Sequence, residues 1–181
     1  FQIEPKLFHA LALYRAERYD DATRAMRIVL QLAEQIGNRW FEGIARNGLA
    51  YGEFLHSGET EHSFAELMRA AGIFHAEGDV FQVMELQLNA SHVALAAKRF
   101  DDVERLLNNC EATATLLDNP YVRGGIALVR GRLALARGDA DGARGHFQDS
   151  HALFAALRAS KQAAEALALL NSIPAARRRR S

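Results

Sequence analysis

The sequence predicts an all-α fold, a solenoid of four antiparallel helix hairpins followed by a terminal helix. In several segments the apolar residues recur at steps of three and four, which is typical of amphipathic helices. A mostly small residue stands at one position of each return helix, at offsets of 41, 40 and 40 residues: Ala22, Ser63, Val103 and Ala143. The breaks between hairpins repeat with offsets of 41 and 40 residues: Gly37, Gly78 and Asp118. Two agreeing registers with one fixed period indicate stacked repeats.

Each element follows from local signals. Asp20 or Asp21 is expected to cap the return helix of the first hairpin, and Thr60 that of the second. Gly37 suits a left-handed C-cap, and Pro120 suits the first turn of a helix. The expected bounds are about 6–37, 40–78, 80–118 and 120–158 for the hairpins and 161–171 for the terminal helix. Residues 1–174 are expected to form a single domain, and 175–181 a basic, disordered tail.

Composition excludes several classes of protein. The chain of 181 residues is 49% hydrophobic and 24% charged, close to the globular average, which argues against a disordered or membrane protein. The formal net charge is zero, so no global attraction to nucleic acid or anionic lipid is expected. Cys110 is the single cysteine, which favours a reducing compartment, the cytoplasm. The chain opens at Phe1 without a methionine, and we interpret it as a segment of a longer protein.

The repeated motif resembles the tetratricopeptide repeat. The matching pieces are RYDDATRAM, RFDDVERLL and GDADGARGHF, each with a turn, a small residue and a large apolar residue four positions later. Val103 departs mildly from the small residue of the family pattern, and the period exceeds the usual 34 residues. It is closer to the long-helix variant found in bacterial signal-transduction ATPases and transcriptional regulators. The resemblance implies a right-handed superhelix and says almost nothing about function.

No catalytic, cofactor-binding or metal-binding residues are predicted, and we do not expect an enzyme. His146 and His151 are five residues apart, which places them on different faces of a helix, unlike a zinc-binding i,i+4 pair. His56 and His62 flank a turn and are interpreted as exposed polar groups. Cys110 falls at an apolar step, so we expect a buried, unreactive thiol.

Polar stripes on the first helix of each hairpin are the candidate binding surface, because the resemblance implies that these helices line a concave groove. The alternative is the solvated face that every amphipathic helix must have. The predicted partner-binding residues come from the second, third and fourth hairpins: Arg46, Asn47, Glu85, Asn89, His92, Arg123 and Arg130. Arginines in such a groove could hold a partner carboxylate by bidentate hydrogen bonds.

The two last segments suggest different roles. The tail Arg177–Arg180 is short and has no interleaved aromatic residues, so a solvated end is favoured over direct contact with nucleic acid. The helix at 161–171 leaves one apolar side exposed unless it caps the fourth hairpin or docks on a second copy of the chain. We therefore expect possible self-association through this helix, and no membrane contact.

The sequence favours a protein–protein interaction module, the sensor or assembly segment of a larger bacterial regulator. One alternative is a stand-alone adaptor or chaperone that binds a peptide in its concave groove. Another is a sensor of a small molecule or a signalling peptide. The assignment to a larger bacterial regulator rests on the resemblance of the repeats, and the sequence identifies no partner.

The repeat register generates a stability prediction. Phe147 stands four residues after the small residue Ala143, so its side chain is expected to lie between the helices. Phe147→Ala should lower the free energy of unfolding by roughly 3–5 kcal/mol. Thermal denaturation followed by circular dichroism measures this, and an unchanged melting temperature would contradict the register.

Overall fold

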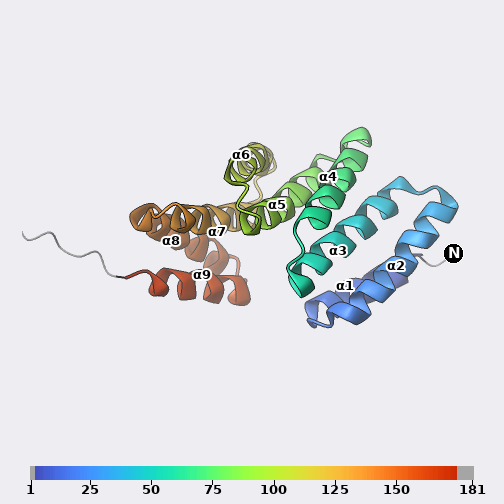
Figure 1. Cartoon of the computed structure of the whole chain (residues 1–181), viewed down its shortest axis with the longest axis horizontal. Helices are drawn as coiled ribbons and strands as arrows, with labels where there is room; N and C mark the ends of the chain where they lie inside the picture. Colours follow the sequence, from blue (N-terminus) through green and yellow to red (C-terminus); the bar gives the residue numbers. More distant parts are fainter. Residues whose placement is uncertain (1–2, 175–181) are drawn as a thin grey trace, which may run out of the picture. The chain divides into compact units, whose positions relative to one another are not determined.

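The computed structural model describes residues 3–174, and this part of the chain forms nine α-helices (Figure 1). The predicted basic tail at 175–181 lies outside the described residues. The helices are α1 (Ile3–Arg15), α2 (Tyr19–Ile36), α3 (Arg39–Ser57), α4 (Glu61–Ala76), α5 (Val80–Ala96), α6 (Phe100–Leu116), α7 (Pro120–Ala136), α8 (Ala140–Ala156) and α9 (Ser160–Ser172). Among these residues no helix is both long enough and apolar enough to traverse a bilayer.

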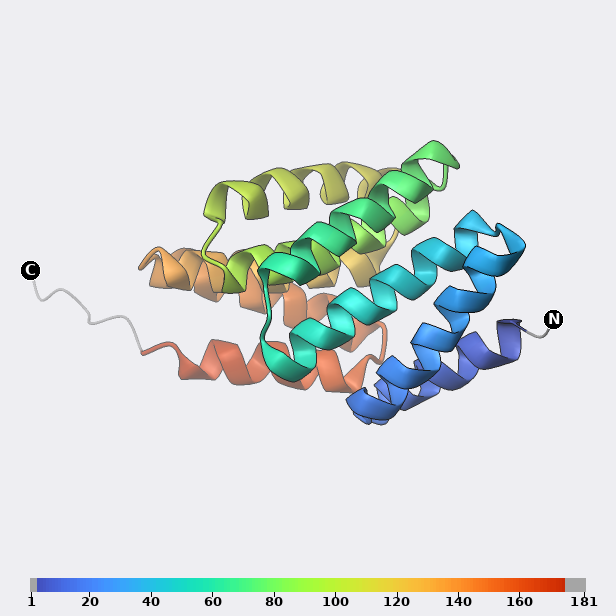
Figure 2. The same ribbon diagram turned by 45° about the vertical axis from the view of Figure 1, so that its right-hand side comes forward.

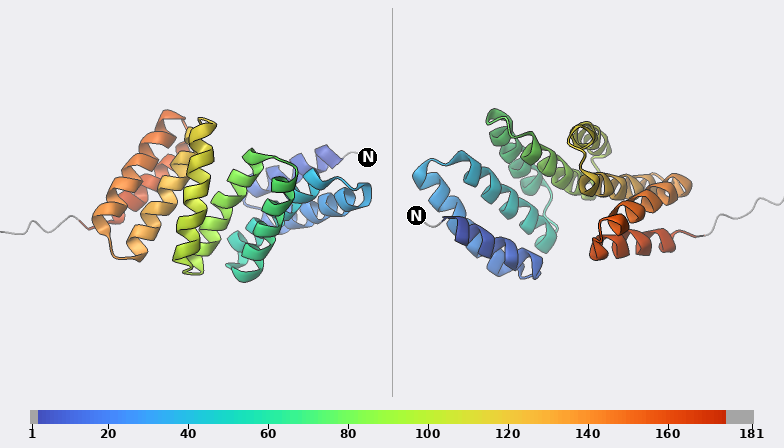
Figure 3. Two further views of the ribbon diagram at one scale, coloured as in Figure 1. Left: turned by 90° about the horizontal axis from the view of Figure 1, so that it is seen from above. Right: turned by 180° about the vertical axis from the view of Figure 1, so that it is seen from behind.

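The chain divides into two compact units, Phe1–Asp102 (unit 1) and Val103–Ser181 (unit 2). In unit 1 each helix packs on the next from α1 to α5, and α3 also contacts α1 and α5. The first helices of the hairpins thus lie beside one another, with α2 and α4 packed against them (Figure 2). In unit 2, α8 packs between α7 and α9 (Figure 3).

A residue with a positive φ angle stands in every turn between helices. These residues follow one another at intervals of 20 or 21 positions: Glu17, Gly37, Gly58, Gly78, Lys98, Asp118, Gly138 and Arg158. Glycine takes this left-handed conformation without steric cost, whereas the four other residues adopt it at some cost in energy. The chain therefore reverses direction at half the repeat period, and the predicted C-cap at Gly37 is confirmed with φ of 66°.

The helix starts agree only partly with the predicted caps. Four side-chain caps were not predicted: Asn38, Asp79, Asn119 and Asp139 each accept a hydrogen bond from a backbone N–H in the first turn. Thr60 occupies the N-cap position of α4 but makes no such bond with its side chain. The carboxylate of the preceding residue, Glu59, accepts from the backbone of residues 62 and 63 in its place, because its longer side chain reaches both donors.

The helix α2 also begins without the predicted aspartate cap. Its N-cap is Arg18, which makes no side-chain capping bond, and the carboxylate of Asp21 pairs with Arg18 and Arg24. The guanidinium hydrogen bond of Arg18 is the main cause that lowers the pKa of Asp21. The helix α1 starts earlier than expected, at Ile3, because a proline is tolerated in the first turn, where its missing N–H has no partner to lose.

The predicted core register is confirmed. Ala22, Ser63, Val103 and Ala143 are all fully buried, and so is Cys110. Four residues further along, the return helices of the first, second and fourth hairpins place large side chains in the core: Met26, Leu67 and Phe147. Protein interiors are close-packed, so side-chain size must be matched across such a helix crossing.

Two crossings show this matching directly. A Cβ atom added to Gly131 would overlap the ring of Phe147, so α7 and α8 approach each other with no room for a side chain on α7. At the other end of the same pair, Gly124 faces Phe154, and in unit 1 the equivalent Gly43 faces Phe74, whose ring would lie 2.7 Å from an added Cβ. Each of these three rings thus lies opposite a glycine, with the least room at Gly131 and Gly43.

This size matching predicts a coupled pair of substitutions. Gly131→Ala should lower the free energy of unfolding by about 1–2 kcal/mol, although alanine favours helices, because overpacking outweighs the gain in propensity. Phe147→Leu introduced together with it should recover part of this loss, because the shorter side chain makes room for the added methyl group. Denaturant unfolding of the two single variants and the double variant measures the coupling. Strictly additive losses would show that the two residues do not compete for one space.

Candidate functional site

Polar residues of α3 and α5 meet in unit 1 and form what we call the α3–α5 strip: Asn47, Tyr51, Glu85, Asn89 and His92. The Nδ2 atom of Asn89 donates a hydrogen bond of 3.0 Å to Oδ1 of Asn47. The rings of Tyr51 and His92 lie next to this pair along the helices, with centroids 6.2 Å apart. All five side chains are half-buried. The structure therefore brings together four of the seven predicted binding residues.

The asparagine pair keeps most of its hydrogen-bonding capacity. An asparagine amide offers two donors and an acceptor with two lone pairs, and the pair uses one donor and one acceptor between them. The Nδ2 group of Asn47 and Oδ1 of Asn89 can therefore bond a further molecule. A polypeptide backbone, with one donor and one acceptor per residue, matches these groups.

Glu85 stands one helical turn before Asn89 on the same face of α5. Burial raises the pKa of its carboxyl group above the usual value. Among the described residues, no hydrogen bond or ion pair of Glu85 offsets this burial. A half-buried carboxylate without a counter-charge destabilises the fold, so its presence needs an explanation other than packing.

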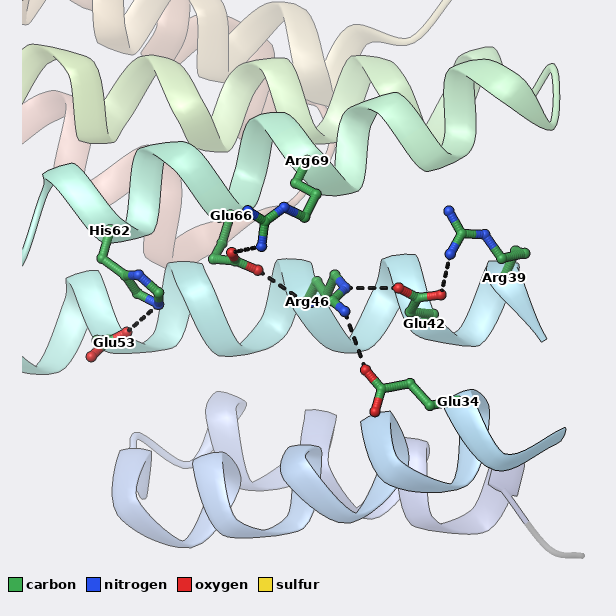
Figure 4. Close-up of polar contacts among 8 residues, drawn as sticks. All are labelled: Glu34, Arg39, Glu42, Arg46, Glu53, His62, Glu66 and Arg69. Carbon is green, nitrogen blue, oxygen red and sulfur yellow. Dashed lines mark hydrogen bonds and ion pairs between the residues drawn. The ribbon is translucent and has the colours of Figure 1, made fainter. Parts of the chain in front are cut away.

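Arg46 lies outside the α3–α5 strip, although it is the sequence neighbour of Asn47. It faces α2 and α4, where three carboxylates surround its guanidinium group (Figure 4). The distances are 2.9 Å to Glu42, 3.2 Å to Glu66 and 3.2 Å to Glu34. Successive residues of a helix point about 100° apart, which explains why the two neighbours have different surroundings.

The charged groups of this Arg46 cluster attract one another and connect neighbouring helices. Burial alone would lower the pKa of Arg46, but the hydrogen bonds and charges of Glu42 and Glu66 outweigh it and raise the pKa. Arg39 lies 2.6 Å from Glu42, and Arg69 pairs with Glu66 (Figure 4). Each of these two acids therefore pairs with a second arginine besides Arg46. The cluster joins three helices and uses the charge that the sequence analysis assigned to a partner.

The remaining predicted residues, Arg123 and Arg130, lie in unit 2 on α7. They line an open cavity of about 550 Å³ with residues of α6 and α8. Arg130 is held by Glu111 of α6 at 2.6 Å and by Asn108 at 3.1 Å. Arg123 is exposed, and no ion pair of this residue is found in the described part of the chain.

The histidines interpreted as polar surface groups pair loosely with acids. His56 lies 3.5 Å from Asp20, and His62 lies 3.9 Å from Glu53. Within residues 3–174 no three histidine, cysteine or acidic side chains are grouped so that they could hold a metal ion. The sequence analysis did not single out Tyr51, because the residue type and its position in the sequence do not distinguish a groove-lining tyrosine from one that packs in the core.

The Arg46 cluster predicts a position-dependent loss of stability. Arg46→Met should lower the free energy of unfolding by about 1–3 kcal/mol, because it leaves half-buried carboxylates with fewer cations. Arg24→Met is the matched control, since Arg24 pairs with Asp21 on an exposed face of one helix, and should cost no more than about 0.5 kcal/mol. Urea unfolding compares the two variants, and equal losses would show that the cluster is only a surface ion pair.

Comparison with known proteins shows the fold. No protein-family model matches the chain, and no curated protein matches its sequence. It is similar in structure to a signal transduction ATPase with numerous domains from Pyrococcus horikoshii that has a tetratricopeptide repeat sensor. The TM-score is 0.73 at 13% identity, over 94% of this chain and 26% of that one.

A second similar structure is a Rap protein complexed with competence and sporulation factor. Here the TM-score is 0.65 at 14% identity, over 95% of this chain and 52% of that one. The chain thus spans about a quarter and about half the length of the two proteins. At such low identity the likeness concerns the fold, and the chain has the tetratricopeptide-like fold of stacked antiparallel helix hairpins.

Proposed function

We propose that this chain is a protein–protein interaction module that holds a protein or peptide partner on the α3–α5 strip. The observation that carries the proposal is Glu85, a half-buried carboxylate with a raised pKa and no counter-charge among the described residues. Beside it, the amides of Asn47 and Asn89 retain free donors and acceptors. A partner that supplies a cation to Glu85 and a backbone to the amides would complete both sets of interactions.

The parent protein is proposed to be a larger cytoplasmic regulator of bacterial signalling or transcription, in which this segment senses a partner or assembles a complex. The similarity to a protein with a tetratricopeptide repeat sensor supports this role. The Rap protein complexed with competence and sporulation factor supports a factor-binding role and favours the second candidate, a sensor of a small molecule or signalling peptide. A stand-alone adaptor or chaperone is the further alternative. The proposal includes no catalytic role, nucleic-acid contact or membrane contact.

A binding experiment tests the strip. Wild-type chain, Asn89→Ala and Asn109→Ala are immobilised and used to capture proteins from a lysate of the source organism, which mass spectrometry then identifies. Asn109 is an exposed asparagine of α6 and serves as the matched control. We expect a partner that wild type and Asn109→Ala retain and that the folded Asn89→Ala variant loses. Equal capture by all three would remove the strip from the proposal.

The unpaired carboxylate of Glu85 also predicts that its removal stabilises the fold to an extent that depends on pH. A folded-state pKa raised above the unfolded value means that ionised Glu85 destabilises the fold at pH 7, and that this penalty fades as the carboxyl group protonates at lower pH. Glu85→Gln should therefore raise the free energy of unfolding at pH 7, and the gain should shrink toward pH 4. Urea unfolding at several pH values measures it. A loss of stability at pH 7 would show that Glu85 already has a stabilising partner.

A further inference from the structure

The cavity beside Arg123 and Arg130, which we call the α7 groove, is an opening between α6 and α8 with α7 as its floor. Its volume is about 550 Å³, within the range of ligand-binding clefts. Its apolar lining residues are Ile126, Ala127, Ala152, Leu153 and Ala156. Charged and polar groups stand around them: Glu111, Arg123, Arg130, His146 and Asp149.

The repeat register shows which residue occupies the equivalent place in unit 1. Gly43 and Gly124 are equivalent, 81 residues apart, because each faces a phenylalanine of its own return helix. The same offset relates Arg46 to Ala127. In unit 1 the long side chain of Arg46 fills the space between α2 and α4, whereas Ala127 leaves the corresponding space between α6 and α8 open.

The three acids that bond Arg46 in unit 1 also have no acidic counterparts at the equivalent positions of unit 2. Glu42, which bonds Arg46 in unit 1, corresponds to Arg123, and Glu66 corresponds to His146 at an offset of 80. Glu34 corresponds to the uncharged Thr115. A cation surrounded by three carboxylates is thus replaced by an open position whose lining includes two arginines, a histidine and two acids. Arg130 is paired with one of these acids, Glu111, whereas Arg123 has no ion pair among the described residues, so an anion is the occupant that would complement Arg123.

We infer that the α7 groove binds an acidic side chain of a protein partner, whose carboxylate meets Arg123 at the position left open by Ala127. This inference rests on the proposed interaction function and adds a second contact surface to it. Arg123 is available because it is exposed and forms no ion pair among the described residues. A guanidinium group binds a carboxylate through two parallel hydrogen bonds, which favours this residue as the anchor.

The other charges of the groove define the partner more closely. Arg130 is already bonded to Glu111, and Asp149 stands one turn from His146 on α8. Two arginines and two acids line the groove, so these four charges sum to zero. A nucleic acid would require a surplus of positive charge along its phosphates. One carboxylate next to apolar side chains fits the single free arginine and the alanine- and leucine-containing lining.

The test uses peptides as probes. Random twelve-residue peptides displayed on phage are selected on the immobilised full chain, and the enriched ones are synthesised with a fluorescent label. We expect them to carry aspartate or glutamate beside apolar residues. Replacing that acid by its amide should weaken binding about tenfold, the size of one charge-assisted hydrogen bond in free energy. Fluorescence anisotropy gives the dissociation constants.

Three variants of the chain test whether the selected peptides bind in the α7 groove. Arg123→Gln removes the anchor and Ala127→Met fills the open position, and each should weaken binding about tenfold while the melting temperature stays close to that of wild type. Arg27→Gln is the matched control, because Arg27 is an exposed arginine of α2 that has no ion pair within the described residues, and should leave affinity unchanged.

Several outcomes would overturn the inference. Enriched peptides without acidic residues, or acidic peptides that bind Ala127→Met as tightly as wild type, would remove the groove as the site. Displacement of the peptide by an equal concentration of inorganic phosphate would show a general anion site in place of a protein-binding one. If Asn89→Ala abolishes binding and Arg123→Gln does not, the proposed function stands and this inference falls. If no peptide is enriched, this inference falls, while the capture experiment with Asn89→Ala still decides the proposed function.

Discussion

The close crossing of two helices within each hairpin is the constraint on which the rest of the structure depends. Phe147 fits between α7 and α8 because Gly131 has no side chain, and Phe74 and Phe154 face glycines for the same reason. Turns with a left-handed residue every 20 or 21 positions bring the chain back to this crossing each time. Since every hairpin buries its apolar face against its neighbours, a mismatch at one crossing would be felt by the adjacent helices as well.

The glycine–phenylalanine contacts determine how the two helices of a hairpin cross, and other positions of the first helices can differ between repeats. Arg46 and Ala127 are equivalent by the repeat offset, and each stands three residues after a glycine that faces a phenylalanine of the return helix. Arg46 nevertheless fills its surroundings, whereas Ala127 leaves a cavity. The same framework can therefore hold a closed ion cluster in unit 1 and an open groove in unit 2.

The sequence was sufficient to predict most of the fold, since its signals are local and repeated. The buried column that begins at Ala22 and the left-handed turn at Gly37 follow directly from spacing and residue type. The caps were harder to predict. A glutamate at position 59 captures the backbone donors that Thr60 was expected to bind, and side-chain reach of this kind depends on the geometry of the turn.

The candidate site was predictable only in part, because a polar stripe shows which residues share a face of a helix but not what that face meets. Asn47 and Asn89, both predicted as partner-binding residues, are hydrogen-bonded to each other across α3 and α5, whereas Arg46 is bound by acids from two other helices. The proposed binding residues differ from the other charged residues in having no oppositely charged partner. Glu85 has no cation and Arg123 has no anion bonded to it among the described residues. Satisfied charges such as Arg46 stabilise the fold, and a partner would have to break existing bonds to use them.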